Sequence, residues 1–212
     1  MISVIITAGG SSTRFKGKNK LLYEIDGKPV ILYSIELFHS LDYVNEIIVA
    51  ANSSIIENLK LMVSNFSKVK IINGGETRQD SVFEALKECN SPEFVIIHDG
   101  ARPFVKKETI DSCLQKAKEV GAAIVAVKTI DTIKIVDENG IIVSTPDRKT
   151  LWNAQTPQIF NYELILSLHQ KYKGMNFTDD SLLFEKDNLP VAISEGEYSN
   201  FKITTLQDLA KP

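Results

Sequence analysis

The sequence has few cysteines, one tryptophan, no long hydrophobic run and no strong excess of either charge. Among its 212 residues there are 2 cysteines and 3 histidines. Cys89 and Cys113 stand among helix-forming residues outside any CxxC pair, so we expect two reduced, half-buried thiols and no disulfide framework. No cysteine and histidine spacing is typical of zinc. This cysteine usage favours a cytoplasmic protein without a zinc site.

The weak charge balance limits the classes of partner. There are 24 basic and 27 acidic residues, a net charge of −3, which argues against a dedicated nucleic-acid binder. A local basic cleft for a phosphorylated small molecule remains compatible with this balance. No apolar run approaches the roughly 20 residues of a membrane span. The first residues carry no basic leader, so we expect neither a membrane partner nor a signal peptide.

Short β-rich runs alternate with helical patterns in the first part of the chain. The expected strands are 3–8, 44–51, 69–72, 94–97 and 122–127, and the expected helices are 29–39, 53–64, 77–89 and 107–120. Strands buried on both faces that alternate with such helices are typical of a parallel sheet of right-handed βαβ units. We therefore predict an α/β protein, a three-layer α/β/α sandwich with a mostly parallel, Rossmann-like sheet.

A hairpin interrupts this alternation. Residues 129–135 alternate in polarity, Asn139–Gly140 is a strong turn signal, and 141–145 forms a second short run. An inserted hairpin is usually a lid or an arm that reaches a partner subunit, and the alternative is a decorated edge of the same sheet. We predict a single domain over 1–212, with 129–150 as a protruding arm. Beyond the arm we expect a return through 151–160, helices at 162–172 and 179–185, and a strand at 190–194.

Three polar segments with glycines follow three of the expected strands, at 7–14, 74–81 and 98–103. Ligands of open parallel sheets bind outside the carboxyl ends of the strands. The first segment leads into four cations between Arg14 and Lys20, a composition that suits a polyphosphate. It matches neither GxGxxG nor a Walker A loop, which argues against a nicotinamide-dependent dehydrogenase. By itself this segment is weak evidence for a polyphosphate site, because an ordinary strand-to-helix turn also explains its glycines.

The other two segments offer more specific side chains. Thr77 and Asp80 have the spacing of a helix cap, which explains them fully but does not explain the adjacent glycine pair or Arg78. In the third segment, Asp99 is placed to hold Mg²⁺ beside a bound polyphosphate through one or two protein oxygens. We expect His98 to be a structural hydrogen-bonding residue, because no motif places a nucleophile beside it.

These segments form part of a longer order of blocks along the chain. The order is Ala8-x-Gly10, Arg14, Lys20, then GGETRQDSV at 74–82, HDGARPF at 98–104, DTIK at 131–134, LWNAQTPQIF at 151–160, TD at 178–179 and KIT at 202–204. In this order the sequence resembles the 2-C-methyl-D-erythritol 4-phosphate cytidylyltransferase family over essentially its whole length. The blocks at 98–103 and 154–158 are the most specific.

The resemblance implies a nucleotidyltransferase-type fold and transfer of CMP from CTP to methylerythritol phosphate, with Mg²⁺ and release of pyrophosphate, in non-mevalonate isoprenoid synthesis. It also implies a homodimer joined through the hairpin arm. The implied catalytic residues are Arg14, Lys20 and Lys202, and the implied nucleotide-binding residues are Ala8, Gly9, Gly10, Gly75, Glu76, Ser81, Asp99 and Ala101. The implied acceptor-binding residues are Thr132, Arg148 and Lys202, and the implied metal ligand is Asp99. The resemblance further implies that Asp99, Arg102, Thr156 and Thr178 are contacts or supports of the site.

The sequence is also compatible with two other functions. A ribitol 5-phosphate cytidylyltransferase shares the fold, the CTP site and the arm, and it differs in the acceptor pocket. A non-catalytic nucleotide-binding protein on the same fold is the alternative from another class. The joint presence of five residues argues against the latter, because a binding module needs no cations aimed at a reacting phosphorus. They are Arg14, Lys20, Asp99, Arg102 and Lys202. Lys18 is an alternative to Lys20 as the main triphosphate lysine.

Overall fold

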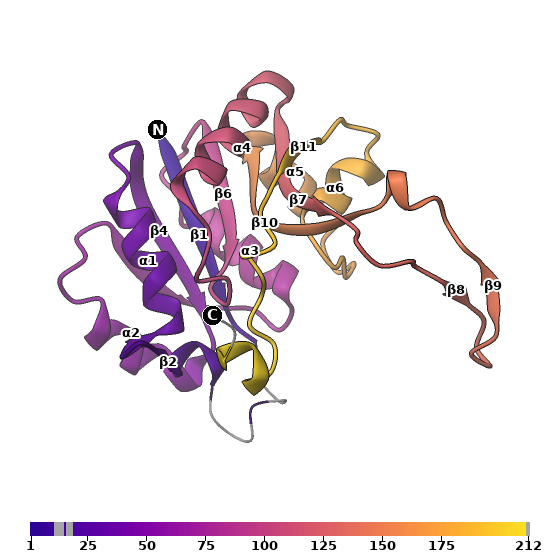
Figure 1. Cartoon of the computed structure of the whole chain (residues 1–212). Helices are drawn as coiled ribbons and strands as arrows, with labels where there is room; N and C mark the ends of the chain where they lie inside the picture. The colour runs from indigo at the N-terminus through magenta and orange to yellow at the C-terminus, as the bar shows by residue number, and fades with distance from the viewer. Residues whose placement is uncertain (11–14, 16–18, 211–212) are drawn as a thin grey trace.

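One sheet forms the centre of the protein (Figure 1). The computed structural model describes residues 1–10, 15 and 19–210, and within these residues the sheet has seven strands in the order β11-β7-β10-β6-β1-β4-β5. Their bounds are β1 Ile2–Ala8, β4 Val44–Ala51, β5 Val69–Asn73, β6 Phe94–Asp99, β7 Ala122–Lys128, β10 Trp152–Asn161 and β11 Ala192–Glu195. The predicted strands lie within two residues of these bounds, and β6 extends through His98 to Asp99.

All neighbouring strands are parallel except at β10, which runs antiparallel between β6 and β7. The segment 151–160 was expected only as a return of the chain, and it is a full strand of the sheet. The reason lies in its connection. β7 reaches β10 through the hairpin arm and without a crossover helix, and a hairpin connection joins antiparallel strands.

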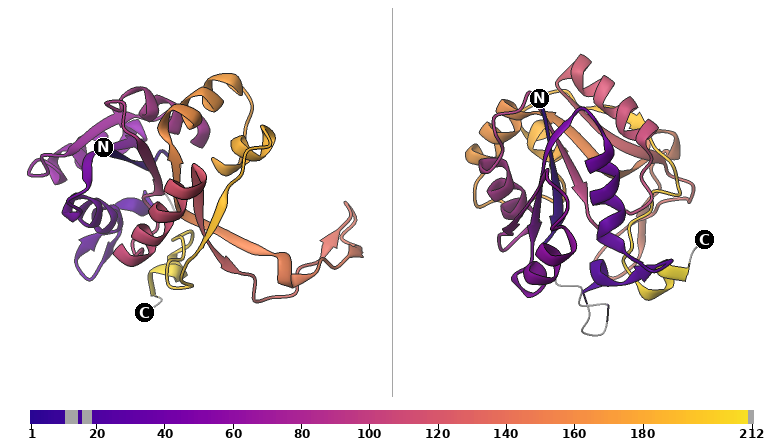
Figure 2. Two further views of the ribbon diagram at one scale, coloured as in Figure 1. Left: turned by 90° about the horizontal axis from the view of Figure 1, so that it is seen from above. Right: turned by 90° about the vertical axis from the view of Figure 1, so that its left-hand side faces the viewer.

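Helices cover both faces of the sheet, which confirms the three-layer α/β/α prediction (Figure 2). One core joins the sheet to α1 Val30–Ser40, α2 Ile56–Met62 and α4 Lys107–Val120, and the other joins it to α3 Arg78–Lys87, α5 Tyr162–Lys171 and α6 Ser181–Lys186. Successive residues of a strand point to opposite faces. Accordingly, Val4 and Ile6 of β1 belong to the first core and Ile5 belongs to the second.

Several short elements were not predicted. A small hairpin, β2 Glu24–Ile25 and β3 Lys28–Pro29, precedes α1, and short 3₁₀ turns occur at η2 Lys20–Leu22, η3 Ser53–Ile55 and η4 Arg148–Thr150. The helical turn expected at the end of the chain is the 3₁₀ turn η5 Leu206–Ala210. The expected helix 53–64 is therefore a 3₁₀ turn followed by the shorter α2. The side chain of Asn52 accepts a hydrogen bond from the amide of Ser54 at 3.0 Å and so starts that turn.

The arm projects away from the sheet (Figures 1 and 2). Its strands are only β8 Ile135–Val136 and β9 Ile142–Ser144, so the predicted strand 129–135 forms only at its last residue. Away from the sheet, a two-stranded ribbon has no third strand or helix to pack against, and such ribbons are marginal in water. The turn itself is well defined, because the Asp137 carboxylate accepts from the amides of Asn139 at 3.0 Å and Ile141 at 2.8 Å.

The two cysteines are free and lie in the cores. Cys113 is fully buried and Cys89 is 9% exposed, so both are more deeply buried than the expected half-buried thiols. Cys113 stands on α4 and Cys89 in the turn that follows α3. Burial raises the pKa of each thiol to about 12. In the residues that the structure describes, no helix is both long enough and apolar enough to cross a bilayer.

Candidate functional site

The carboxyl ends of four strands lie at one level of the sheet. Ala8 of β1 pairs with Ala51 of β4, Ala51 pairs with Asn73 of β5, and Thr7 pairs with Asp99 of β6. The segments that follow these strands therefore meet at one edge, as expected for ligand sites of open parallel sheets. This register places Thr7 of β1 beside Asp99 of β6 although more than ninety residues separate them in the sequence.

A cavity of about 470 Å³ opens at this edge. It is lined by Thr7, Ala8, Gly9, Gly10, Lys20, Leu21, Asn52, Gly75, Glu76, Thr77, Arg78, Ser81, Asp99, Ala101 and Lys202. Its lining includes both predicted catalytic lysines and all eight predicted nucleotide-binding residues. A volume of this size is ordinary for small-molecule sites. Thr7, Leu21, Asn52, Thr77 and Arg78 line the cavity in addition to the predicted set.

Two of the predicted site residues that the structure describes, Thr132 and Arg148, do not line this cavity. A further one, Arg14, lies outside the described residues. Thr132 and Arg148 belong to the arm and are exposed, and the Arg148 guanidinium donates to the carbonyl of Ile130 at 2.7 Å. Within one copy of the chain, the structure therefore brings together the nucleotide set but not the acceptor set.

The glycine pair before α3 packs against the start of that helix. A Cβ at Gly75 would lie 2.3 Å from the Cβ of Asp80, and a Cβ at Gly74 would lie 2.8 Å from the Oγ of Ser81. Thr77 and Asp80 form the predicted capping box, with the Thr77 side chain accepting from the Asp80 amide at 3.0 Å. The glycines thus allow the strand to turn tightly into a capped helix, while Gly75 still lines the cavity.

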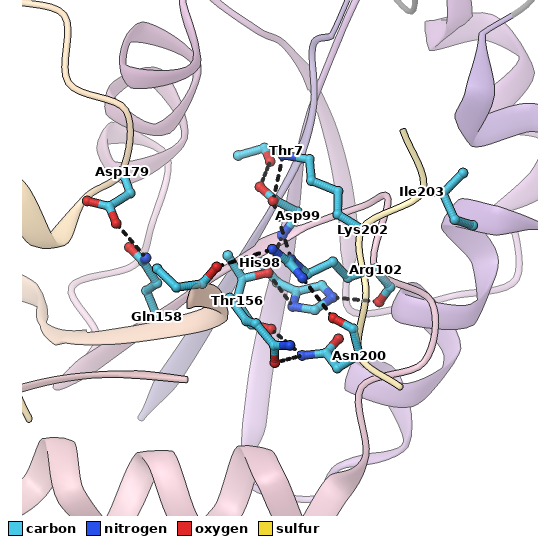
Figure 3. A network of polar contacts seen from close by, with 12 residues as sticks. Thr7, His98, Asp99, Arg102, Thr156, Gln158, Asp179, Asn200, Lys202 and Ile203 are labelled. Carbon is cyan, nitrogen blue, oxygen red and sulfur yellow. Dashed lines mark hydrogen bonds and ion pairs between the residues drawn. The ribbon is translucent and has the colours of Figure 1, made fainter. Parts of the chain in front are cut away.

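Asp99 is the buried carboxylate of the cavity wall (Figure 3). Its Oδ2 lies 2.8 Å from the Lys202 Nζ and 3.7 Å from the Arg102 Nε. Its Oδ1 lies 3.6 Å from the Arg78 Nε and accepts from the Thr7 hydroxyl at 3.3 Å. Burial disfavours the charged carboxylate, but the three cations outweigh burial and hold the pKa of Asp99 well below its usual range. Asp99 is therefore ionised at neutral pH.

Lys20 and Lys202 both line the cavity although they lie 182 positions apart in the sequence. The Lys20 Nζ donates to the carbonyl oxygen of Ile203 at 2.8 Å. The Ile203 amide in turn donates to the carbonyl of Ala101 at 2.8 Å. Lys20 of η2, the segment after β6 and the C-terminal segment are thus joined beside the cavity.

Arg78 is held by a second buried carboxylate that sequence reasoning missed. The Arg78 Nη1 donates to the Asp180 Oδ2 at 2.7 Å, and the Nε2 of buried His169 lies 3.4 Å from the Asp180 Oδ1. Burial opposes the charges of this pair, but Asp99 and Asp180 raise the pKa of Arg78, and Arg78 lowers the pKa of Asp180. The only sequence motif beside Asp180 is the one that contains Asp179. The partner of Asp180, Arg78, lies 102 residues away in the sequence, so the motif does not reveal the pair.

His98 has the structural role that the sequence predicts (Figure 3). Its Nε2 lies 3.1 Å from the carbonyl of Arg102, and its Nδ1 lies 3.1 Å from the Thr156 hydroxyl. A carbonyl only accepts, so Nε2 carries the proton and Nδ1 accepts from Thr156. The Thr156 oxygen also accepts from the Asp99 amide at 3.0 Å. Burial lowers the pKa of His98 to about 4, so the ring is neutral at pH 7.

The carboxylates that line the cavity are Glu76 and Asp99. In the described part of the chain, no group of three or more His, Cys, Asp or Glu side chains is arranged around a common metal position. Mg²⁺ in nucleotide enzymes is usually held by one or two carboxylates together with substrate phosphates. The donor set therefore fits a magnesium ion shared with a nucleotide, and it does not fit a metal held by protein ligands alone.

A three-layer α/β/α fold whose parallel strands end at a glycine-lined cavity with converging lysines is that of a nucleotidyltransferase. Backbone amides and small residues approach a nucleotide closely, and the cations neutralise its phosphates. No side chain of the described cavity forms the nucleophile and base pair of a covalent mechanism. The site thus has the composition for transfer of a nucleotidyl group between two phosphates.

Comparisons with known proteins agree with this class. A family model, IspD, described as 2-C-methyl-D-erythritol 4-phosphate cytidylyltransferase, matches residues 2–212. A cytidylyltransferase of that description from Caldanaerobacter subterraneus subsp. tengcongensis is 44% identical, over 98% of this chain and 95% of that protein. One from Bacillus licheniformis is 41% identical, over 97% and 91%. The crystal structure of 4-diphosphocytidyl-2C-methyl-D-erythritol synthase from Anaerococcus prevotii matches with a TM-score of 0.89 and 34% identity, covering 99% of this chain and 94% of that one.

The chain therefore belongs to the 2-C-methyl-D-erythritol 4-phosphate cytidylyltransferase family. This confirms the resemblance drawn from the sequence blocks. The relatives named above do not favour the ribitol 5-phosphate alternative or the non-catalytic alternative.

The buried neutral ring of His98 predicts a pH-dependent stability. Its pKa is about 4 in the folded protein and about 6.5 in the unfolded chain, so between these values the unfolded state binds more protons. The free energy of unfolding should therefore fall as the pH is lowered from about 6.5 to about 4, with His98 contributing about 3 kcal/mol. Urea denaturation of the wild type and His98→Asn at several pH values measures this contribution. An equal pH slope in both proteins would contradict it.

Proposed function

We infer that the protein transfers CMP from CTP to 2-C-methyl-D-erythritol 4-phosphate and releases pyrophosphate. The observation that carries this inference is the cavity at the strand ends. It gathers the two lysines and eight nucleotide-binding residues that the family resemblance selects, in a chain that matches the family over residues 2–212. The product is 4-diphosphocytidyl-2-C-methyl-D-erythritol, a precursor in non-mevalonate isoprenoid synthesis.

The chemistry suits a site without a general base. An oxygen of the acceptor phosphate attacks the α-phosphorus of CTP, and the bond from that phosphorus to the oxygen bridging to the β-phosphate breaks. The electron pair leaves with pyrophosphate. The attacking phosphate is already an anion at neutral pH, so no proton has to be removed first. Positioning and charge stabilisation supply most of the catalysis in such transfers.

We assign Lys20 and Lys202 to the reacting phosphates. Both line the cavity, and their amines rest on the Ile203 carbonyl and the Asp99 carboxylate at 2.8 Å. Each amine is therefore already oriented before nucleotide binds, and each exchanges a protein oxygen for a phosphate oxygen. Charge that builds on the α-phosphate in the transition state is stabilised by cations that need little reorganisation.

We place the base and ribose of CTP along the backbone of Ala8 to Gly10 and beside Gly75, Glu76 and Ser81. A second cavity of about 310 Å³ shares Gly9, Asn52, Gly75 and Glu76 with the first, which gives this end of the site room for a ring system. The Ser81 Oγ donates to the Thr77 carbonyl at 2.8 Å and accepts from the Gly75 amide at 3.1 Å, so its position is set by the start of α3.

We propose Mg²⁺ as the divalent metal of the reaction. When bound, it would neutralise charge on the triphosphate. Asp99 would hold it, and the Oδ1 oxygen is the better placed of the two, because its contacts with Thr7 and Arg78 are longer than the 2.8 Å contact of Oδ2 with Lys202. We also propose a cytoplasmic location, which the unpaired thiols of Cys89 and Cys113 support.

We further propose a homodimer joined through the arm. Seven large apolar side chains of the arm are exposed: Ile130, Ile133, Ile135, Val136, Ile141, Ile142 and Val143, at 40–66%. A concentration of exposed apolar side chains of this kind on one segment marks an interaction site. An arm that lies on a second copy would cover this surface and bring Thr132 and Arg148 toward the partner's cavity, where they would bind the acceptor.

The function is tested by pyrophosphate release with CTP and Mg²⁺, comparing 2-C-methyl-D-erythritol 4-phosphate with ribitol 5-phosphate as acceptors. We expect rapid release with the first and little with the second. Rapid release only with ribitol 5-phosphate would overturn the acceptor assignment and keep the mechanism. CTP binding without release with either acceptor would support the non-catalytic alternative.

Lys20→Ala is expected to lower kcat at least about a hundredfold while the KM for CTP changes much less. The reason is that a preorganised cation contributes mainly to the transition state, where removal of one donor typically costs about 3 kcal/mol. Steady-state kinetics of pyrophosphate release measures both constants. Lys60→Ala, which removes an exposed lysine of α2, is the control and should match the wild type. A near-normal kcat for Lys20→Ala would remove Lys20 from its assigned role.

Ile142→Asp is expected to convert the dimer to monomers and to lower activity. A charge in the middle of the apolar arm surface, where Ile142 is 59% exposed, is costly only if that surface becomes buried. Sedimentation velocity across a dilution series measures the oligomeric state. Leu61→Asp, at a residue 79% exposed on α2, is the matched control and should leave the state unchanged. A wild-type protein that is monomeric at micromolar concentration would contradict the dimer.

A further inference from the structure

The segment that carries Lys202 has no regular structure of its own. Residues 201–204 lie in neither a helix nor a strand. Backbone hydrogen bonds of the sheet therefore do not determine where the Lys202 Cα lies. Its position depends on the contacts that the neighbouring residues make with the rest of the protein.

Asn200 makes the upstream contacts and is buried at 1% exposure. Its Nδ2 donates to the backbone carbonyl of Thr156 at 2.9 Å and to the side-chain Oε1 of Gln155 at 3.1 Å (Figure 3). Its own carbonyl accepts from the Arg102 Nη1 at 2.7 Å. One residue thus attaches the segment to β10 and to the segment after β6.

Ile203 makes the downstream contacts. Its amide donates to the Ala101 carbonyl and its carbonyl accepts from the Lys20 Nζ, each at 2.8 Å. Lys202 therefore lies between two attachment points, and its Nζ reaches Asp99 at 2.8 Å. Because the side chain of lysine is long and flexible, its amine is held on Asp99 only if the backbone that bears it is held as well.

We propose that Asn200 is a positioning residue for Lys202: by attaching the backbone two residues upstream to β10 and to Arg102, it holds the Lys202 amine at the reacting phosphates. This inference rests on the proposed function. Asn200 is not among the residues that line the cavity, and it acts on Lys202 through the backbone. Sites of this kind lose activity when their supporting contacts loosen, because a misplacement of about 1 Å can lower a rate a hundredfold.

The variant Asn200→Ala removes both side-chain hydrogen bonds. We expect kcat for pyrophosphate release to fall at least about tenfold while the KM for CTP stays within about threefold, since binding is shared by many residues of the cavity. Tyr162→Phe is the matched control. It removes one buried hydrogen bond, from the Tyr162 hydroxyl to the Leu86 carbonyl at 3.1 Å, at a place remote from the cavity. The kcat of Tyr162→Phe should equal that of the wild type even if its Tm falls as much as the Tm of Asn200→Ala.

A double-mutant cycle separates positioning from a general loss of folding. In the Lys202→Ala background, Asn200→Ala should lower the residual single-turnover rate by less than about twofold, because the amine that it positions is gone. An equal loss of rate with and without Lys202 would overturn the proposal. So would a normal kcat in the single Asn200→Ala variant of an active enzyme.

A measurement without turnover keeps the proposal independent of the acceptor assignment. We expect acetylation of the Lys202 amine by acetic anhydride, followed by mass spectrometry, to become several-fold faster in Asn200→Ala, because the amine no longer rests on Asp99. The rate at exposed Lys60 should not change, and neither rate should change in Tyr162→Phe. An unchanged Lys202 rate would overturn the positioning role. If the wild type releases no pyrophosphate but Lys202 is exposed by the variant, the proposed function fails and the positioning contact stands.

Discussion

The ionised carboxylate of Asp99, buried among three cations, is the interaction on which the cavity depends. A carboxylate at 6% exposure is costly without partners, and here Lys202, Arg78 and Arg102 compensate it. The three cations come from three separate segments: the C-terminal segment, the start of α3 and the segment after β6. The ion pairs of the Asp99 carboxylate therefore hold these three segments next to one another at the cavity. Two of these cations, Arg78 and Lys202, also line the cavity together with Lys20, and such a lining suits a triphosphate.

Around this centre lies a layer of contacts that hold the charged groups in place. Asp180 orients Arg78 from behind, the neutral ring of His98 links Thr156 to the Arg102 carbonyl, and Asn200 attaches the backbone of Lys202. These groups are buried, and the contacts made by Thr156 and Asn200 lead to β10. The antiparallel strand thus supports the site as well as completing the sheet.

Much of the fold and most of the nucleotide site follow from local sequence. Strands buried on both faces and glycine-containing segments at their ends predict a parallel sheet and its ligand edge, and the family's blocks then select the residues. The rest depends on pairings distant in sequence. The antiparallel placement of β10 results from the arm that precedes it, and the short strands of the arm reflect the lack of packing partners. Asp180 and Asn200 stand outside the specific blocks, and their partners lie 102 and 98 residues away.

The central claim is that Asp99 and the Ile203 carbonyl hold Lys202 and Lys20 ready for the phosphates of CTP. A crystal structure of the protein with CTP and Mg²⁺ tests this claim most directly. We expect the triphosphate inside the 470 Å³ cavity, with oxygens within about 3.2 Å of both lysine amines. A nucleotide whose phosphates lie outside the cavity, with both amines still on Asp99 and Ile203, would contradict it.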